Sequence, residues 1–115
     1  MQQEISRQTL SNEAIELIAA RFRALGEASR LKLILAVEHE EKNVSQLVAA
    51  TGLSQPNVSR HLQTLTEAGF LTRRKERMSV FYAIADTTIC HLCREVVGSQ
   101  QKRLIAQAKS FGHEV

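Results

Sequence analysis

A short turn between two helical segments, within residues 45–68, constrains the fold of this chain more than any other feature. The first segment is short and begins at Ser45, its expected N-terminal cap. Gly52 then permits a tight turn, because glycine adopts left-handed backbone conformations without a steric penalty. The second segment starts with Ser54 as a cap and carries Pro56 in its first turn, where a missing N–H costs no hydrogen bond. The pattern predicts a helix-turn-helix unit.

Three further helices are expected around this unit. Apolar residues recur at steps of three and four over residues 12–25 and 87–108, which predicts two amphipathic helices. Residues 28–39 are apolar on most sides, so we expect a helix that is buried at the centre of the fold. A charged loop over residues 38–43 is expected to join it to the helix-turn-helix.

A two-stranded hairpin is predicted directly after the helix-turn-helix. Residues 71–75 and 78–84 read as short strands, and Glu76 and Arg77 form the expected tip between them. The resulting order is α-α-α-α-β-β-α, which is a mainly α fold with a small β-hairpin. A hairpin in this place makes residues 71–84 the wing of a winged helix-turn-helix.

Length and composition predict one folded domain that spans the whole chain, residues 1–115. A chain of 115 residues, 43% of them hydrophobic, has room for one core and is too apolar to be disordered. No apolar run approaches the ~18 residues that a membrane span needs, and the polar start lacks the apolar core of a signal peptide. Two cysteines are too few for a disulfide-built scaffold. We therefore expect a cytoplasmic protein with no membrane partner.

One side of the second helix of the helix-turn-helix is polar and free of acidic groups over most of its length. If Val58, Leu62 and Leu65 face the core, the opposite side carries no large apolar residue and, up to residue 66, no acidic residue. Amide and guanidinium groups of this kind read base edges in the major groove of DNA. The DNA-binding candidates are Gln55, Asn57 and Arg60, expected on bases, with Ser59 and His61 at the margin of the contact and Ser54 at the helix start.

The excess positive charge of the chain is concentrated in the predicted wing. Fifteen Lys and Arg against twelve Asp and Glu leave a net charge of +3. The run 73–77 holds four basic residues and one acidic residue, also +3, so the rest of the chain is neutral on balance. A solvated turn is one explanation for such a run, but its place in a wing favours contact with the backbone or minor groove of double-stranded DNA. The wing candidates are Arg73, Arg74, Lys75 and Arg77.

The two terminal helices, 12–25 and 87–108, carry more apolar surface than a small core needs. Packing them against a second copy would bury that surface and form a homodimer through the terminal helices. A twofold dimer places two recognition helices about 34 Å apart, which matches successive major grooves on one side of the duplex. The alternative is that both helices close the core of a monomer.

Four segments resemble the bacterial ArsR/SmtB-type repressors, and together they span roughly residues 15–97. The resemblance implies a winged-helix homodimer that blocks a promoter. It also implies release from operator DNA when a metal ion or a reactive small molecule is sensed. The segments are 22–31 (FRALGEASRL), 54–62 (SQPNVSRHL), 67–71 (EAGFL) and 80–86 (VFYAIAD).

The sensing residues of that family do not carry over to this sequence. Residues 43–47, which match the metal-binding box of some members, contain no cysteine. Asp86 matches the start of a second kind of metal site, but Thr88 stands where that site has a histidine. Members that sense sulfur or oxidants have a cysteine on the second helix, where this chain has Leu35.

Cys90 and Cys93 are the remaining sensor candidates, and three interpretations stay open. They are packing residues, a redox pair that senses oxidant or reactive sulfur, or ligands of a thiophilic metal ion such as Zn, Cd, Pb or As. A metal site would need a third ligand from His91, Asp86, His113 or the partner subunit. Cys90 is the closer of the two to the start of its helix, where the helix dipole is expected to lower the pKa of a thiol.

The sequence favours a sequence-specific DNA-binding regulator of transcription over an enzyme. A CxxC motif suggests a thiol oxidoreductase when it lies near a βαβ unit, which the predicted element order lacks. The favoured function is a repressor that a metal ion or a thiol-reactive signal releases from its operator. Two alternatives are a winged-helix regulator without a cysteine sensor and a winged-helix module that binds proteins, which would expose apolar residues on its recognition helix.

Overall fold

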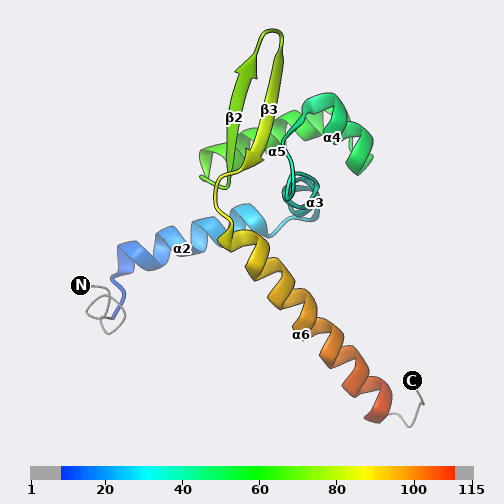
Figure 1. The fold of residues 1–115 in the computed structure, drawn as a ribbon. Helices are drawn as coiled ribbons and strands as arrows, with labels where there is room; N and C mark the ends of the chain where they lie inside the picture. Colours follow the sequence, from blue (N-terminus) through cyan, green and yellow to red (C-terminus); the bar gives the residue numbers. More distant parts are fainter. Residues whose placement is uncertain (1–8, 111–115) are drawn as a thin grey trace.

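The protein, described from a computed structural model over residues 9–110, has the predicted winged helix-turn-helix fold with one additional strand. Figure 1 shows α3, α4 and α5 packed together, with the hairpin β2–β3 on one side of them and α2 and α6 leaving on the other. In chain order the elements are α2 (Asn12–Leu25), α3 (Ala28–Ala36), β1 (Lys42–Asn43), α4 (Val44–Thr51), α5 (Gln55–Glu67), β2 (Leu71–Glu76), β3 (Ser79–Ile84) and α6 (Thr88–Ser110).

The additional strand, β1, lies where a loop was predicted. Lys42 and Asn43 pair with Tyr82 and Phe81 of β3, so the sheet has the antiparallel order β1-β3-β2. A strand of two residues is too short to show an alternating pattern, and only its pairing with β3 defines it. The helix before it, α3, ends at Ala36 rather than at residue 39.

The start of α4 also differs from the prediction. The side-chain oxygen of Asn43 accepts the backbone N–H of Gln46, and the side-chain oxygen of Gln46 accepts the backbone N–H of Asn43. This reciprocal pair is a capping box, which satisfies two N–H groups at the helix start. The prediction of Ser45 as the cap is wrong, because Ser45 is already the second residue of the helix. The turn after α4 is as predicted, since Gly52 has a left-handed φ of 74°.

The core is built around α3 and the inner face of α5. Leu33 and Ile34 of α3 are fully buried, as are Leu62 and Leu65 of α5. Leu47 of α4 is buried with them, so α4 and α5 are both fixed against α3. This packing determines which side of α5 faces outward.

Arg21 fixes the direction in which α2 leaves the core. Its guanidinium donates to the carbonyl of Ala68 at 2.9 Å and to Asp86 Oδ2 at 3.1 Å, and it lies 4.4 Å from the ring centre of Phe70. Asp86 Oδ1 accepts the backbone N–H of Thr88 at 3.0 Å, at the start of α6. One side chain therefore connects α2 with the end of α5 and with Asp86, two residues before α6.

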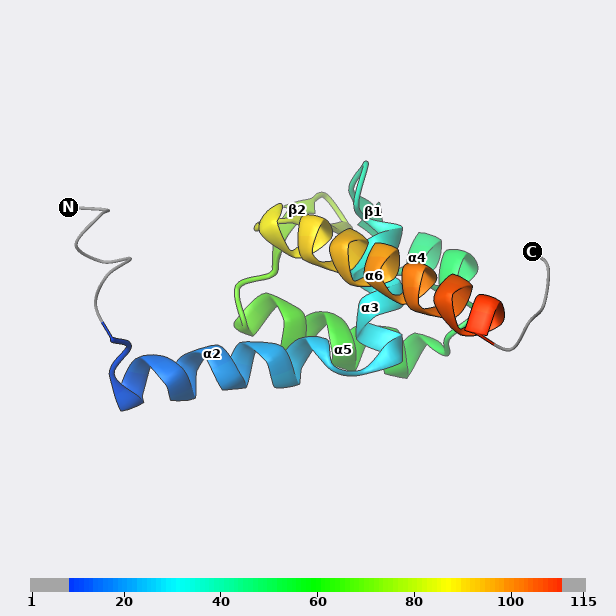
Figure 2. The ribbon, with the colours of Figure 1, turned by 90° about the horizontal axis from the view of Figure 1, so that it is seen from below.

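The helices α2 and α6 project from the core as two arms (Figures 1 and 2). The radius of gyration is 17.9 Å, whereas a compact domain of this size has about 13 Å. Large apolar side chains are exposed on both arms, among them Phe22 at 56% and Val96 at 60%. Within residues 9–110, no helix combines the length and the apolar character needed to cross a bilayer.

The capping box generates the first prediction. Asn43→Ala removes the acceptor at the start of α4 and should lower the free energy of unfolding by about 1 kcal/mol. Ser45→Ala is the matched control, because it changes the cap that the sequence pattern had suggested, and its effect should stay below about 0.5 kcal/mol. Urea unfolding measures both values. The comparison requires that the slope of unfolding free energy against urea concentration is the same for each variant. An equal or larger loss in Ser45→Ala would contradict the capping assignment.

Candidate nucleic-acid interface

The outer face of α5 is polar from its first residue. Val58, Leu62 and Leu65 are buried, as the pattern predicts, while Gln55, Asn57, Ser59 and Arg60 are exposed. Ser54 caps the helix, because its hydroxyl oxygen accepts the backbone N–H of Asn57 at 3.3 Å. The candidates for base contact are thus brought together on one exposed surface at the N-terminal half of the helix.

Two hydrogen bonds arrange the side chains of this face. Arg60 Nη2 donates to Asn57 Oδ1 at 3.0 Å, which holds two of the three base-reading candidates side by side. Gln63 Nε2 donates to Glu67 Oε1 at 3.1 Å. Gln63 is exposed one turn beyond Ser59, so it extends the polar surface toward the wing although it was not a site candidate.

His61 does not lie on this outer face. Its side chain is only 7% exposed, with Nδ1 3.4 Å from Arg30 Nη1 and Nε2 3.5 Å from Glu27 Oε2. The prediction that His61 lies at the margin of the DNA-contacting surface is wrong about its placement. At about 100° per residue, residue 61 lies beside residues 58, 62 and 65 on the inner half of the helix. Helical spacing therefore already placed residue 61 on the inner side, and only the polar nature of histidine suggested the surface.

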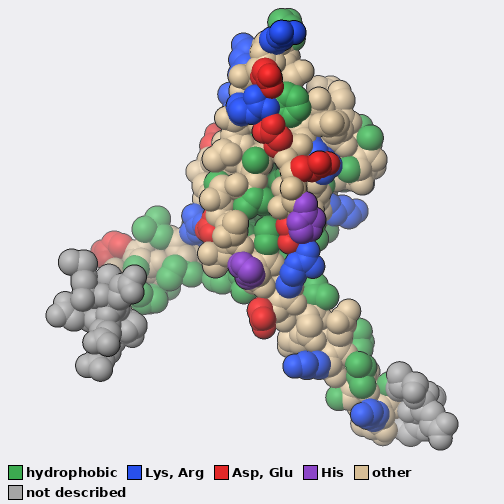
Figure 3. Space-filling view, in the orientation of Figure 1, with side chains coloured by type: hydrophobic (Ala, Val, Ile, Leu, Met, Phe, Trp, Pro, Cys, Tyr) green, Lys and Arg blue, Asp and Glu red, His purple; other side chains and the backbone are tan. Residues whose placement is uncertain are grey.

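The wing places its basic residues on two different faces. Arg73 and Lys75 alternate with Arg74 along β2, so they share the face that includes Tyr82 of β3. Arg73 and Tyr82 line a shallow hollow together with Ser59 and Gln63 of α5. Figure 3 shows Lys and Arg side chains along the hairpin toward its tip. One face of the wing is therefore continuous with the polar face of α5.

Arg74 points to the other face of the wing. Its guanidinium donates to both carboxylate oxygens of Glu41 and to Glu76 Oε2 at 2.8 Å, and it lies 4.9 Å from the ring centre of Phe81. The hydrogen bond from Arg74 lowers the pKa of the Glu41 carboxyl below its ordinary value, although burial opposes the shift. Arg74 thus joins the wing to the segment before β1.

The tip of the wing lies one residue later than predicted. Because β2 includes Glu76, the turn is formed by Arg77 and Met78. Arg77 has a left-handed φ of 57°, and Met78 is 96% exposed. Arg77 therefore stands at the outermost point of the hairpin.

The two cysteines have different surroundings near the start of α6. Cys90 is buried, and Cys93 is half-buried. Burial raises the pKa of the Cys90 thiol, and the negative charge of Glu38 raises it further. The expectation that the helix start lowers this pKa is wrong, because loss of hydration and neighbouring negative charge both favour the neutral thiol.

The described residues do not assemble a metal cluster around these thiols. No group of three or more His, Cys, Asp or Glu side chains with suitable geometry is present in residues 9–110. Both carboxylate oxygens of Asp86 already accept hydrogen bonds within the protein, one from Arg21 and one from the N–H of Thr88. His91 is exposed. His113 lies outside the described residues.

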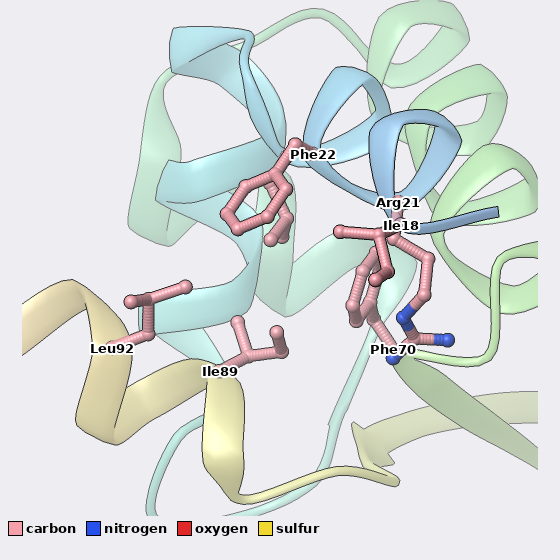
Figure 4. Close-up of a pocket in the computed structure, with 7 residues that line it drawn as sticks. Ile18, Arg21, Phe22, Phe70, Ile89 and Leu92 are labelled. Atoms are coloured by element: carbon pink, nitrogen blue, oxygen red, sulfur yellow. The ribbon is translucent and has the colours of Figure 1, made fainter. Parts of the chain in front are cut away.

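An apolar groove runs between the two arms. Figure 4 shows Phe22 of α2 facing Ile89 and Leu92 of α6, with Arg21 beside Phe70 at one end. A second hollow shares Phe22, Leu25 and Leu92 with the first and continues along α6, so the two form one surface. We call this surface the α2–α6 groove. Its lining residues are Ile18, Phe22, Leu25, Leu31, Leu35, Ile89, Leu92, Cys93, Val96 and Val97.

Comparison with known proteins gives consistent results. Residues 27–73 match the family described as bacterial regulatory protein, arsR family. A transcriptional repressor SmtB homolog from Synechocystis is 30% identical over 99 residues, which are 86% of this chain and 75% of the relative. A "Probable mercury resistance operon repressor" from Streptomyces lividans is 34% identical over 71 residues, which are 62% of this chain and 57% of that relative.

The fold is shared with solved structures. The homodimeric winged helix-turn-helix DNA-binding domain of a Mycobacterium bovis protein superposes with a TM-score of 0.67 at 22% identity. The match covers 95% of this chain and 97% of that domain. With its winged helix-turn-helix fold and these relatives, the chain belongs to the ArsR family of bacterial regulatory proteins.

Proposed function

We propose that this protein is a homodimeric repressor of transcription that binds a specific double-stranded operator. The observation that carries the proposal is the exposed face of α5, which is polar, holds no acidic residue before Glu67 and adjoins the basic face of the wing. A protein-binding module would instead be expected to expose large apolar residues on this face. The repressor names of the relatives support the same function.

The arrangement divides DNA recognition between helix and wing. The N-terminal half of α5 enters the major groove, where Arg60 suits guanine and Gln55 or Asn57 suits adenine. Arg73, Lys75 and Arg77 lie on the wing, within reach of phosphates or the minor groove. The helix supplies the choice of sequence, and the wing supplies affinity that varies little with sequence.

The α2–α6 groove supports the homodimer. Phe22, Leu35, Val96 and Val97 are each about half exposed, and burying them against a second copy removes this apolar surface from water. The Mycobacterium bovis domain, with the same fold, is homodimeric. A twofold axis near the arms gives two copies of α5 the separation of about 34 Å that successive major grooves require.

A metal ion and a thiol-reactive compound are the two candidate signals for release from DNA. The name of the Streptomyces relative makes a metal ion one candidate. The donor set in residues 9–110 does not fit a Zn, Cd, Pb or As site within one chain, because Cys90 and Cys93 have no third ligand there. A thiol-reactive signal fits Cys93 better than Cys90, since Cys93 is half-buried and lines the α2–α6 groove.

Binding to selected DNA tests the proposed function. A duplex selected from a random library is titrated with the reduced protein, and fluorescence anisotropy reports the dissociation constant. We expect binding at least about 1,000-fold tighter than to a scrambled duplex at the same salt concentration. Equal affinity for both duplexes, or no binding, would remove the function and favour the protein-binding module.

Wing variants of the same protein give a sharper prediction. The double variant Arg73→Ala/Arg77→Ala should weaken binding to selected and scrambled duplexes alike. It should also flatten the slope of log Kd against log salt by roughly one unit per lost contact. Arg74→Ala is the matched control, and it should change the slope less because two carboxylates already neutralise Arg74. A slope unchanged by the double variant would remove the wing from the interface.

The groove generates a prediction about assembly. Phe22→Glu or Val96→Glu places a charge on the apolar surface and should convert the dimer to a monomer, because an unpaired buried charge is strongly unfavourable. Met78→Glu is the control, since Met78 is a fully exposed apolar residue on the wing, away from both arms. Sedimentation equilibrium of the three variants measures the change. Dimers that persist in both arm variants would place the interface elsewhere.

The raised pKa of Cys90 generates a prediction about reactivity. Less of the thiol is ionised at neutral pH, so iodoacetamide should alkylate native Cys90 more slowly than Cys90 of the urea-unfolded chain. The rate for native Cys90 should reach its midpoint above pH ~8.5, the usual value for a free thiol. Peptide mass spectrometry at a series of pH values follows the reaction. Faster reaction of the native thiol at pH 7 would identify an activated cysteine instead.

A further inference from the structure

A polar cluster around one buried histidine lies behind the recognition helix, and the proposed function does not use it. His61 projects from the inner side of α5 and, within residues 9–110, is the one buried polar residue, at 6% exposure. Arg30 Nη1 lies 3.4 Å from His61 Nδ1, and Glu27 Oε2 lies 3.5 Å from His61 Nε2. Both partners belong to the start of α3, and Glu27 also caps that helix by accepting the N–H of Arg30 at 3.3 Å.

Arg30 extends this cluster to α2. Its Nε donates to the carbonyl of Ala24, and its Nη2 donates to the carbonyl of Arg23 at 3.3 Å. These carbonyls belong to the last turn of α2, where backbone acceptors have no partner within the helix. One guanidinium therefore holds the end of α2 with two nitrogens and faces His61 of α5 with the third.

A second arginine fixes α2 to the C-terminal end of α5, whereas His61 lies in the middle of that helix. Arg21 donates to the carbonyl of Ala68, the residue that ends α5. Figure 2 shows α2 and α5 running side by side. Apolar contacts between two helices permit small sliding and rotation, whereas hydrogen bonds require particular distances and angles. The two arginines thus define the position of α5 relative to α2 at two points.

We infer that His61 is a positioning residue for DNA recognition, which sets the recognition helix at a defined angle to the dimerisation arm α2. This inference rests on the proposed function, because the arms place the two copies of α5 on the duplex. Each copy of α5 in the dimer reads one half of the operator, which we call a half-site. If His61 and Arg30 hold α5 at one angle to α2, the dimer binds only operators whose two half-sites are separated by one particular distance. Without this contact, each copy of α5 still reads its half-site, but the dimer also binds operators with a different distance between the half-sites.

The donor and acceptor pattern around His61 guides the choice of variants. The guanidinium of Arg30 has only donors, so His61 Nδ1 must accept, and Nε2 then carries the hydrogen that faces Glu27. His61→Leu keeps an apolar body of similar size but removes both polar contacts. His61→Gln keeps one donor and one acceptor and is the conservative variant. His39→Leu is the matched control, since the His39 side chain is 83% exposed.

The test compares two operators for each variant. The first is the selected operator, and the second has one base pair inserted between its half-sites. The ratio of their dissociation constants measures spacing selectivity. His61→Leu should lower this ratio by roughly fivefold or more, within the range of coupling that neighbouring groups show. His61→Gln should restore much of the ratio, and His39→Leu should leave it unchanged.

Several outcomes would overturn the inference. If His61→Leu weakens binding to both operators equally, His61 is a core residue with no role in positioning. If His61→Leu does not fold, Arg30→Lys decides, because lysine keeps the charge but cannot contact α2 and His61 together. An unchanged ratio in Arg30→Lys would then refute the inference. Wild-type protein that binds no duplex selectively would refute the proposed function itself, which is a different result.

Discussion

Burial of one face of α5 is the interaction on which the rest of the structure depends. Val58, Leu62 and Leu65 are completely buried in the core around α3. Each such side chain contributes roughly 1.5–3 kcal/mol, so turning α5 about its axis is strongly unfavourable. The outward direction of the polar residues therefore follows from apolar packing. The wing depends on the same packing, because Phe70 and Leu71 are buried where the chain passes from α5 to β2.

Five arginines of this protein fall into two groups with different tasks. Arg21, Arg30 and Arg74 are engaged by carbonyls or carboxylates of the protein and connect elements that are distant in sequence. Within residues 9–110, no ion pair is formed by Arg73 or Arg77, so their charges remain available to a phosphate backbone. On the hairpin, two carboxylates neutralise Arg74, whereas Arg73 and Lys75 leave positive charge on the face that adjoins α5.

The arms give the molecule its extended shape and leave its largest apolar surface unpaired. Phe22, Leu92 and Val96 line a groove that the core of one chain does not cover. A domain of this size has few apolar residues to leave exposed, since its stability is a small difference between large terms. In the proposed homodimer, a second copy covers this surface and the same contact sets the distance between the two copies of α5. Stability and the geometry of recognition depend on the same surface in that assembly.

Local features were determined by the sequence itself. Ser54 and Gly52 act as expected, because capping and left-handed turns depend on residues a few positions apart. The helix-turn-helix, the wing and the polar face of α5 follow from such local patterns. Asn43 as the cap of α4 is also a local feature, because its partner Gln46 is three positions away, although the prediction chose Ser45. The partners of His61 and Arg74 were decided by the tertiary structure alone. Each is a guanidinium or carboxylate more than thirty positions away, which the pattern of apolar residues does not specify.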